Sequence, residues 1–397
     1  MKRAMKVLIT TDLYTTATNG VVTSVRNLSR ELAEAGHEVK ILTLSDTLHS
    51  HKEGDIYYLH SLPLKIYPDV RMPLPRSAHS QELLRELIAW KPDIIHSQCE
   101  FFSFHYARRI AKRTGAPLVH TYHTQYEQYV SYVMPGRRAG DFLVKTFSRV
   151  RLKKVDIIIA PTAKMKQVLE DYGVKNNIEI VPSGICLQQH QGRMTAPERD
   201  KMRQVLGIPK DHKVVLNLGR LGNEKNLDEV IRLFALQLER RPDLTLLIVG
   251  DGPAREKLCQ QAAELGIGDH VIFTGMVAPD QVQKYYQLGD VFVSASTSET
   301  QGLTYIEAAA NGLPLVCRED PCLDGVIAPG ENGYTYNSPD EFLNEMDKVL
   351  EDPDWCVCAG QKSEQIAAAY GKEQFAQNIE AVYEAAIQAE GERSAIS

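Results

Sequence analysis

Short apolar runs, mostly of β-branched residues, alternate along the chain with longer segments of helical periodicity. Each run is almost continuously apolar, which is typical of strands buried on both faces of a parallel sheet. The alternation therefore predicts an α/β fold made of βαβ units. The expected strands are 6–12, 37–44, 93–98, 117–123, 155–162, 178–184, 213–220, 244–252, 270–277, 290–296 and 313–317.

The same pattern occurs twice. The chain of 397 residues is long for one domain, and "KVVLNLG" at residue 213 echoes "KVLITTD" at residue 6. We predict two Rossmann-like, doubly wound domains that face each other across a cleft, with a boundary in the turn-rich "VPSGICLQQ". The expected domains are 1–186 and 187–371. By analogy alone, a terminal helix at about 372–397 is expected to pack back on the first domain.

Composition is that of a soluble globular protein, with 43% hydrophobic and 24% charged residues. No apolar run reaches the ~18 residues that a membrane span needs, and the start of the chain lacks a cleavage site. We therefore expect a cytoplasmic protein. Its seven scattered cysteines have no zinc-site spacing and are expected to be reduced thiols.

Charge is distributed unevenly, with +8 over residues 1–190 and −14 over the remainder. A basic first half suggests an anionic partner, either nucleic acid or a lipid surface. Segment 135–156 is its most basic part, and Leu143, Phe147 and Val150 recur there at helical spacing. The pattern is typical of a membrane-surface helix, or of a buried helix with a solvated basic face. The net charge of +8 favours the membrane-surface helix. The expected membrane contacts are then its cations, Arg137, Arg138, Lys145, Arg149, Lys153 and Lys154.

Segment 298–312, "SETQGLTYIEAAANG", follows an expected strand and combines a glycine turn with a helix start. Ligands of such sheets bind beyond the carboxyl ends of the strands, and helix N-termini bind phosphate. Two glutamates eight residues apart arise easily by chance among 51 acidic residues, so it is this context that matters. We expect Glu299 to accept hydrogen bonds from the hydroxyls of a sugar, and Glu307 to accept them from the hydroxyls of a ribose. The expected anion site consists of the amides of Gln301, Gly302, Leu303 and Thr304.

Three further segments follow expected strands. "NLGRLGNEKN" (217–226) supplies Arg220 and Lys225, two cations that could stabilise a departing diphosphate without a metal, or form only a surface pair. "TATNGVVTSV" (16–25) turns at Asn19 and Gly20 into a helix, which is weak evidence for a phosphate contact. His123 in "HTYHTQYEQYV" could contact sugar hydroxyls or be a structural histidine. No dinucleotide or P-loop glycine pattern occurs, and no metal site is expected.

Together these motifs resemble glycosyltransferase family 4, enzymes of the GT-B fold that transfer sugars with retention. "GRLGNEKN" resembles the family's cationic element and "ETQGLTYIEA" its E-x-x-G-x-x-x-x-E-A element, although many members have Gly-Phe in place of Thr300-Gln301. The resemblance implies a nucleotide-sugar co-substrate, UDP-glucose by expectation, and no cofactor. It also implies that Arg220 and Lys225 hold the diphosphate, His123 meets the sugar 6-hydroxyl and Gly20 admits the donor phosphate.

Within the family the chain most resembles bacterial diacylglycerol glucosyltransferases. That resemblance implies a membrane lipid acceptor, diacylglycerol by expectation, and an anionic membrane surface as partner. It also implies no nucleic acid partner, and peripheral association with the inner face of the cell membrane. Three alternatives stay open at this point. They are a family 4 transferase with a soluble or cell-wall acceptor, a GT-B nucleotide-sugar epimerase, and a nucleotide-binding module without enzyme activity.

Overall fold

The computed structural model describes residues 3–14, 20–63, 71–73, 77–125 and 137–396. The chain forms two compact units. The first comprises Met1–Gly184 together with Lys372–Ser397, and the second comprises Ile185–Gly371. This division falls two residues before the expected one, and it places the terminal helix in the first unit.

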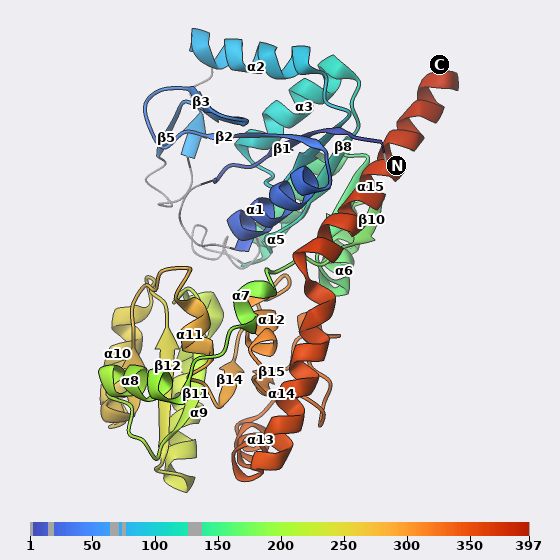
Figure 1. Cartoon of the computed structure of the whole chain (residues 1–397). Coiled ribbons are helices and arrows are strands. Elements are labelled where there is room, and N and C mark those ends of the chain that lie inside the picture. Colours follow the sequence, from blue (N-terminus) through green and yellow to red (C-terminus); the bar gives the residue numbers. More distant parts are fainter. Residues whose placement is uncertain (1–2, 15–19, 64–70, 74–76, 126–136, 397) are drawn as a thin grey trace. The chain divides into compact units, whose positions relative to one another are not determined.

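The first unit is built on a sheet with the strand order β10-β9-β8-β7-β1-β2-β4-β3 (Figure 1). All neighbours pair in parallel except β3 and β4. β5 (Ser61–Pro63) and β6 (Arg71–Pro73) form a separate antiparallel pair. The strands of the sheet are β1 (Lys6–Thr10), β2 (Glu38–Leu44), β3 (His51–Glu53), β4 (Ile56–Leu59), β7 (Ile94–Ser97), β8 (Leu118–Thr121), β9 (Ile157–Ala160) and β10 (Asn177–Ile180).

Helices cover both faces of this sheet, because successive strand side chains point to opposite sides. Leu8 of β1 joins the apolar cluster formed with α2, α3, α5 and α6, whereas Val7 and Ile9 join the cluster formed with α1 and α15. The described helices of this unit are α1 (Gly20–Glu34), α2 (Ala78–Trp90), α3 (Phe102–Thr114), α5 (Arg137–Leu152), α6 (Ala163–Asp171) and α15 (Lys372–Ile396).

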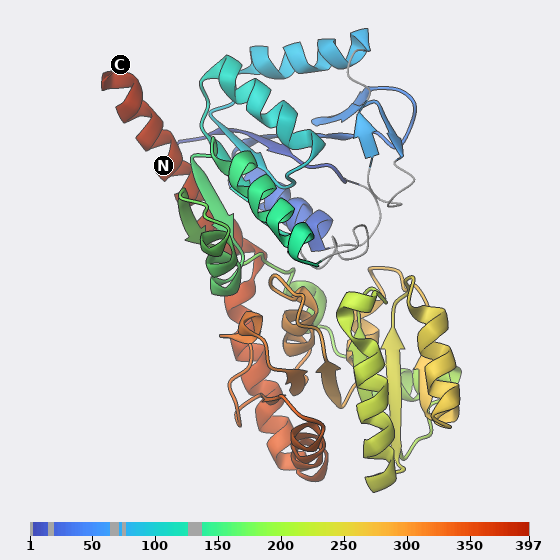
Figure 2. The same ribbon diagram turned by 180° about the vertical axis from the view of Figure 1, so that it is seen from behind.

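The terminal helix α15 lies against α1 and the strands β7 and β8 (Figures 1 and 2). Phe375, Ile379 and Tyr383 are buried in that contact. Two buried polar contacts hold it there, the ion pair of Lys372 with Glu31 and the contact of His37 Nε2 with Glu380 at 3.4 Å. Because His37 Nδ1 accepts from the Met5 amide at 3.0 Å, its proton sits on Nε2 and is donated to Glu380.

The second unit has an all-parallel sheet with the order β13-β12-β11-β14-β15-β16. Its strands are β11 (Lys213–Leu218), β12 (Leu244–Val249), β13 (Val271–Phe273), β14 (Val291–Ser294), β15 (Leu315–Arg318) and β16 (Gly333–Tyr336). Helices α9, α10 and α13 share a core with one face, and α11, α12 and α14 share a core with the other.

The helical segments of this unit include short 3₁₀ turns between the longer elements. The α-helices are α7 (Gln188–Gln191), α8 (Ala196–Leu206), α9 (Leu227–Arg240), α10 (Arg255–Glu264), α11 (Val282–Tyr286), α12 (Leu303–Ala310), α13 (Pro339–Glu351) and α14 (Pro353–Ala367). The 3₁₀ turns are η1 (Asn223–Lys225), η2 (Gly268–His270), η3 (Pro321–Leu323) and η4 (Ala368–Tyr370).

The α/β class and the two Rossmann-like sheets are confirmed, but several predicted strands are too long. β1 ends at Thr10 because Asp12 instead accepts hydrogen bonds from the amides of Phe102 and Ser103 at the start of α3. β13 ends at Phe273, four residues before the predicted end. The sequence pattern also missed β3, β4, β5, β6 and β16, which have only three or four residues each and are too short to show a clear periodicity.

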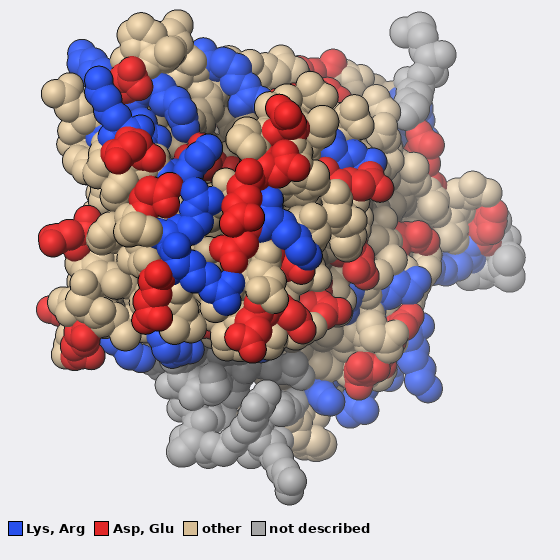
Figure 3. All heavy atoms as spheres, turned by 90° about the horizontal axis from the view of Figure 1, so that it is seen from below, with Lys and Arg blue, Asp and Glu red and all other residues tan. Residues whose placement is uncertain are grey.

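Charged side chains of the second unit pair with each other rather than collecting by sign. Arg240 meets Asp347 at 2.7 Å and Arg318 meets Glu229 at 2.6 Å. On the face drawn in Figure 3, Lys and Arg are likewise interleaved with Asp and Glu. Neither sign therefore dominates that face.

Candidate active site

The loops that follow β11 and β14 lie side by side in the second unit. These two strands are parallel neighbours, so both loops leave the same edge of the sheet. Two hydrogen bonds join the loops: Ser298 Oγ donates to the Glu224 carbonyl at 2.9 Å, and Asn226 Nδ2 donates to the Ala295 carbonyl at 3.1 Å. The residues joined by these bonds are 74 and 69 positions apart in the chain, so the two sequence motifs form one local structure.

Lys225 and Glu299 meet directly within this structure. Lys225 Nζ lies 2.6 Å from Glu299 Oε1, and both side chains are largely buried, with 27% and 16% exposed. A cation expected at a diphosphate thus touches a carboxylate expected at a sugar. An anion and a neutral polyol bound next to each other would meet both groups at this point.

Arg220 has a carboxylate partner that sequence analysis missed. Its Nη2 forms a short ion pair with Glu224 Oε1, four residues later. The Arg220 side chain is 42% exposed, whereas that of Glu224 is only 4% exposed. The guanidinium therefore rests on a buried anion while part of it faces solvent.

Gly302 is required by the start of α12. It occupies the N-cap position with φ 75° and ψ 66°, a left-handed conformation that glycine adopts readily. A Cβ at this position would also overlap the ring of Tyr305. Beyond it, α12 begins at Leu303 and directs the positive end of its dipole toward the same loop as Glu299. Gln301 is buried and Thr304 is partly buried there.

Glu307 lies one turn inside α12 and is partly buried. Its Oε2 accepts a hydrogen bond of 2.8 Å from the hydroxyl of Tyr286, a fully buried residue of α11. Burial raises the pKa of Glu307 to about 7, and the Tyr286 bond works against that rise. Glu307 can therefore change its charge near neutral pH. Sequence analysis missed Tyr286, which lies 21 residues away along the chain.

His123 lies two residues beyond β8 in the first unit, with Nε2 2.7 Å from Gln98 Oε1. Since an amide oxygen only accepts, His123 Nε2 carries the proton. Burial, reinforced by His120, lowers the pKa of His123 to about 3. His123 is thus a neutral hydrogen-bonding group rather than an acid. Of the other first-domain candidates, Gly20 is the first residue of α1, and Asn19 lies outside the described residues.

A buried chain of polar groups continues from His123 toward the terminal helix. Gln98 Nε2 lies 3.1 Å from His96 Nε2, and His96 Nδ1 lies 2.7 Å from the hydroxyl of Tyr383 on α15. Burial holds the pKa of His96 well below its usual value. The far C-terminus of the sequence therefore contributes to the surroundings of His123, which no local pattern could indicate.

Helix α5 spans Arg137–Leu152, within the predicted basic segment. Its buried stripe consists of Val144, Ser148 and Leu152, whereas the apolar residues singled out from the sequence are exposed. The exposed large apolar side chains of α5 are Phe142, Leu143, Phe147 and Val150. The side chains of Lys145, Arg149, Lys153 and Lys154 are exposed too, and those of Arg137 and Arg138 lie outside the described residues.

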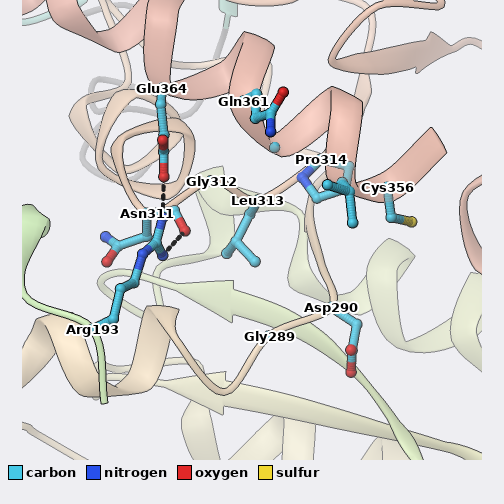
Figure 4. A pocket seen from close by; sticks show the side chains of 12 residues that line it. Arg193, Gly289, Asp290, Asn311, Gly312, Leu313, Pro314, Cys356, Gln361 and Glu364 are labelled. Carbon is cyan, nitrogen blue, oxygen red and sulfur yellow. Dashed lines mark hydrogen bonds and ion pairs between the residues drawn. The ribbon is translucent and has the colours of Figure 1, made fainter. Parts of the chain in front are cut away.

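The second unit also has a hollow of about 350 Å³, which Lys225, Glu299 and Glu307 do not line (Figure 4). Asp290 and Pro314, which line it, directly precede β14 and β15, so it adjoins the amino ends of those strands. Arg193 crosses it to pair with Glu364 of α14 and to donate to the Asn311 carbonyl. Since the predicted groups follow the carboxyl ends, this hollow is not the predicted site.

Metal-binding clusters and membrane-spanning helices are both absent from the part of the chain that the structure describes. Among those residues, no cluster of three or more His, Cys, Asp or Glu side chains could hold a metal ion. None of the helices described has the length and apolar character to cross a membrane.

Comparison with known proteins identifies the family. Residues 18–189 match Glycosyltransferase Family 4, and residues 198–374 match Glycosyl transferases group 1. The chain is also 36% identical to the alpha-monoglucosyldiacylglycerol synthase of Streptococcus pneumoniae over 353 residues, covering 88% of this chain and 79% of that protein. The chain belongs to glycosyltransferase family 4. This glycosyltransferase is also 28% identical to the alpha-monoglucosyldiacylglycerol synthase of Acholeplasma laidlawii, over 96% of each chain.

Solved structures show that this family 4 glycosyltransferase has the GT-B fold. It is similar to Anabaena Alr3699/HepE, crystallised in complex with UDP and glucose, with a TM-score of 0.75 over 96% of this chain and all of that one. The two sequences are 17% identical, so this likeness concerns the fold. The fold predicted from the sequence is thereby confirmed.

Proposed function

We propose that this glycosyltransferase moves glucose from UDP-glucose to diacylglycerol at a membrane surface, with retention of configuration. The observation that carries the proposal is the contact between Lys225 and Glu299 beside the start of α12, because it pairs a cation suited to a diphosphate with a carboxylate suited to sugar hydroxyls. Similarity to two synthases named for monoglucosyldiacylglycerol supports the choice of glucose and of a lipid acceptor.

Each group has a role in holding the donor. Arg220 and Lys225 neutralise the diphosphate, which leaves with a growing negative charge, and the amides at the start of α12 assist them without a metal. Glu299 accepts hydrogen bonds from sugar hydroxyls and Glu307 from the ribose. We also assign His123 to the sugar 6-hydroxyl, and Gly20 to the donor phosphate.

Retention follows from attack on the face that the diphosphate leaves. The acceptor oxygen bonds to the sugar C1 as the bond from C1 to the diphosphate oxygen breaks, and that oxygen takes the acceptor proton. A double displacement would need a carboxylate nucleophile opposite the leaving group. Since Glu299 already touches Lys225, we place it beside the leaving group, not opposite it.

The exposed residues of α5 suit a peripheral membrane contact. Four large apolar side chains and the cations of the same helix and its end are solvent-exposed together. Apolar groups can enter the lipid boundary while cations attract anionic headgroups. We accordingly propose that α5 holds the enzyme on the inner face of the cell membrane.

Product analysis tests the proposed reaction. The protein is incubated with UDP-glucose or UDP-galactose and with diacylglycerol vesicles or soluble sugar acceptors, and the glycosidic bond is examined by NMR. An α-linked glucosyl lipid is the expected product. Glycosylation of soluble acceptors alone, an epimerised donor without acceptor, or a β-linked product would each contradict the proposal.

Glu307 makes donor binding depend on pH. As the pH falls through its raised pKa of about 7, the Glu307 carboxylate gains a proton and becomes a poorer acceptor for ribose hydroxyls. We expect the Kd for UDP-glucose to rise about tenfold between pH 8 and pH 6, because a group with a pKa of about 7 goes from about nine tenths to about one tenth ionised over this range. Calorimetric titration measures this, and Glu307→Gln should bind weakly with little pH dependence. Parallel pH profiles in both proteins would contradict the role of Glu307.

Loss of charge on α5 should weaken membrane binding. Each cation near an anionic bilayer contributes about 1 kcal/mol, so replacing Lys145, Arg149 and Lys153 by Gln should lower vesicle partitioning by roughly two orders of magnitude. Flotation with anionic vesicles at low salt measures the bound fraction. The matched control replaces Lys201, Lys210 and Lys257, three exposed lysines of the second unit, and should float like the wild type. Equal losses in both triple variants would mean that net charge matters and α5 does not.

A further inference from the structure

Glu224 is a buried carboxylate for which the proposed reaction has no direct use. Its side chain is 4% exposed, and burying such a group is costly unless it is paired and hydrogen-bonded. Its carboxylate pairs with Arg220, and its carbonyl accepts from Ser298 Oγ at 2.9 Å. The side chain therefore holds one candidate phosphate ligand, while the backbone is tied to the loop that carries Glu299.

The 3₁₀ turn η1 explains how adjacent residues serve different partners. Successive side chains of such a turn point about a third of a revolution apart. Glu224 is directed into the protein under Arg220, and Lys225 is directed toward Glu299. One turn thus sets the positions of both cations.

Gly222 leaves the space that Glu224 occupies. A Cβ built on Gly222 would overlap both carboxylate oxygens of Glu224. The backbone at Gly222 has φ −102° and ψ 155°, which any residue can adopt. Alanine at this position would consequently displace the carboxylate without straining the backbone.

We propose that Glu224 is a positioning residue, whose carboxylate, seated in the space beside Gly222, fixes the guanidinium of Arg220 to receive the diphosphate of the donor. The inference rests on the proposed function of Arg220. A long arginine side chain loses conformational freedom when it binds phosphate, and a prior ion pair removes much of that cost. The guanidinium has five N–H donors, so it can hold Glu224 and phosphate together.

The test compares Glu224→Gln, Gly222→Ala and Arg220→Gln in the full-length enzyme. Glu224→Gln keeps the shape and removes the charge, and Gly222→Ala keeps the charge and displaces it. We expect Glu224→Gln and Gly222→Ala each to lower kcat/KM for UDP-glucose by about ten- to a hundred-fold. This is the effect expected when a hydrogen bond to a charged group is lost. Asp228→Asn, which breaks an exposed Asp228–Arg232 pair on α9, is the control and should stay within about twofold of wild type.

Double variants separate positioning from a general structural effect. With Arg220→Gln already present, Glu224→Gln should cause no further loss, because its target is gone. With Glu224→Ala present, Gly222→Ala should cost less than about twofold, because the overlap is gone. Additive losses in either pair would overturn the proposal.

The outcomes also separate this inference from the proposed function. If Arg220→Gln lowers activity and Glu224→Gln does not, the positioning role fails and the donor site stands. If Glu224→Gln raises donor affinity, the carboxylate competes with phosphate, and the positioning role fails as well. If Arg220→Gln itself is as active as wild type, the donor assignment of Arg220 fails.

Discussion

Lys225→Met should lower turnover of UDP-glucose by about 10²–10³-fold while the fold is preserved. Removal of one preorganised donor to a developing anion has an effect of this size in other enzymes. Here the substitution also leaves the Glu299 carboxylate, which is only 16% exposed, without its 2.6 Å cationic partner. Its charge would then repel the diphosphate. Steady-state kinetics with saturating acceptor measures the loss.

Two further variants identify its cause. Lys225→Met combined with Glu299→Gln removes the repulsion between Glu299 and the diphosphate, so we expect it to bind the donor more tightly than Lys225→Met alone without recovering turnover. Lys348→Met removes the cation of a comparable pair on α13, Lys348 with Glu345 at 2.8 Å, and should leave kinetics unchanged. Wild-type turnover in Lys225→Met would contradict the proposed role of this lysine.

Lys372→Met should destabilise the first unit by about 3 kcal/mol or more. Lys372 and Glu31 pair where α15 meets α1, with side chains only 11% and 8% exposed. Removing one partner of a buried pair leaves the other charge uncompensated, which typically costs 3–5 kcal/mol. For a domain of this size, the Tm should fall by roughly 6–12 °C. Scanning calorimetry measures the shift.

The double variant Lys372→Met with Glu31→Gln provides the control. It removes both charges at similar volume, and neutral replacements of buried pairs are often tolerated. We expect it to regain most of the lost Tm. If the single and double variants melt at the same temperature as wild type, the pair does not hold α15 in place.

The place of the candidate site in the second unit was predictable because βαβ architecture puts functional loops after strands. Lys225 and Glu299 were both found in this way, and the structure brings them into contact. Their mutual pairing was not predicted, since register between β11 and β14 is set by tertiary packing. Tyr286 reaches Glu307 and Gln98 reaches His123 from separate elements, so neither had a local sequence signal.

Helix α5 shows another limit of sequence patterns. Its periodicity correctly predicts an amphipathic helix, but two apolar stripes run along it. The protein buries the stripe with Val144 and Leu152 and exposes the one with Leu143 and Val150. Periodicity gives the existence of a stripe, whereas the choice between neighbouring stripes depends on the surface against which the helix packs.

A crystal structure of the protein with UDP tests the donor site most directly. We predict that the diphosphate lies within hydrogen-bonding distance of Arg220 and Lys225 and beside the amides at the start of α12, with the ribose hydroxyls on Glu307. UDP bound elsewhere, for example in the hollow beside Arg193, with Lys225 still paired to Glu299, would contradict it.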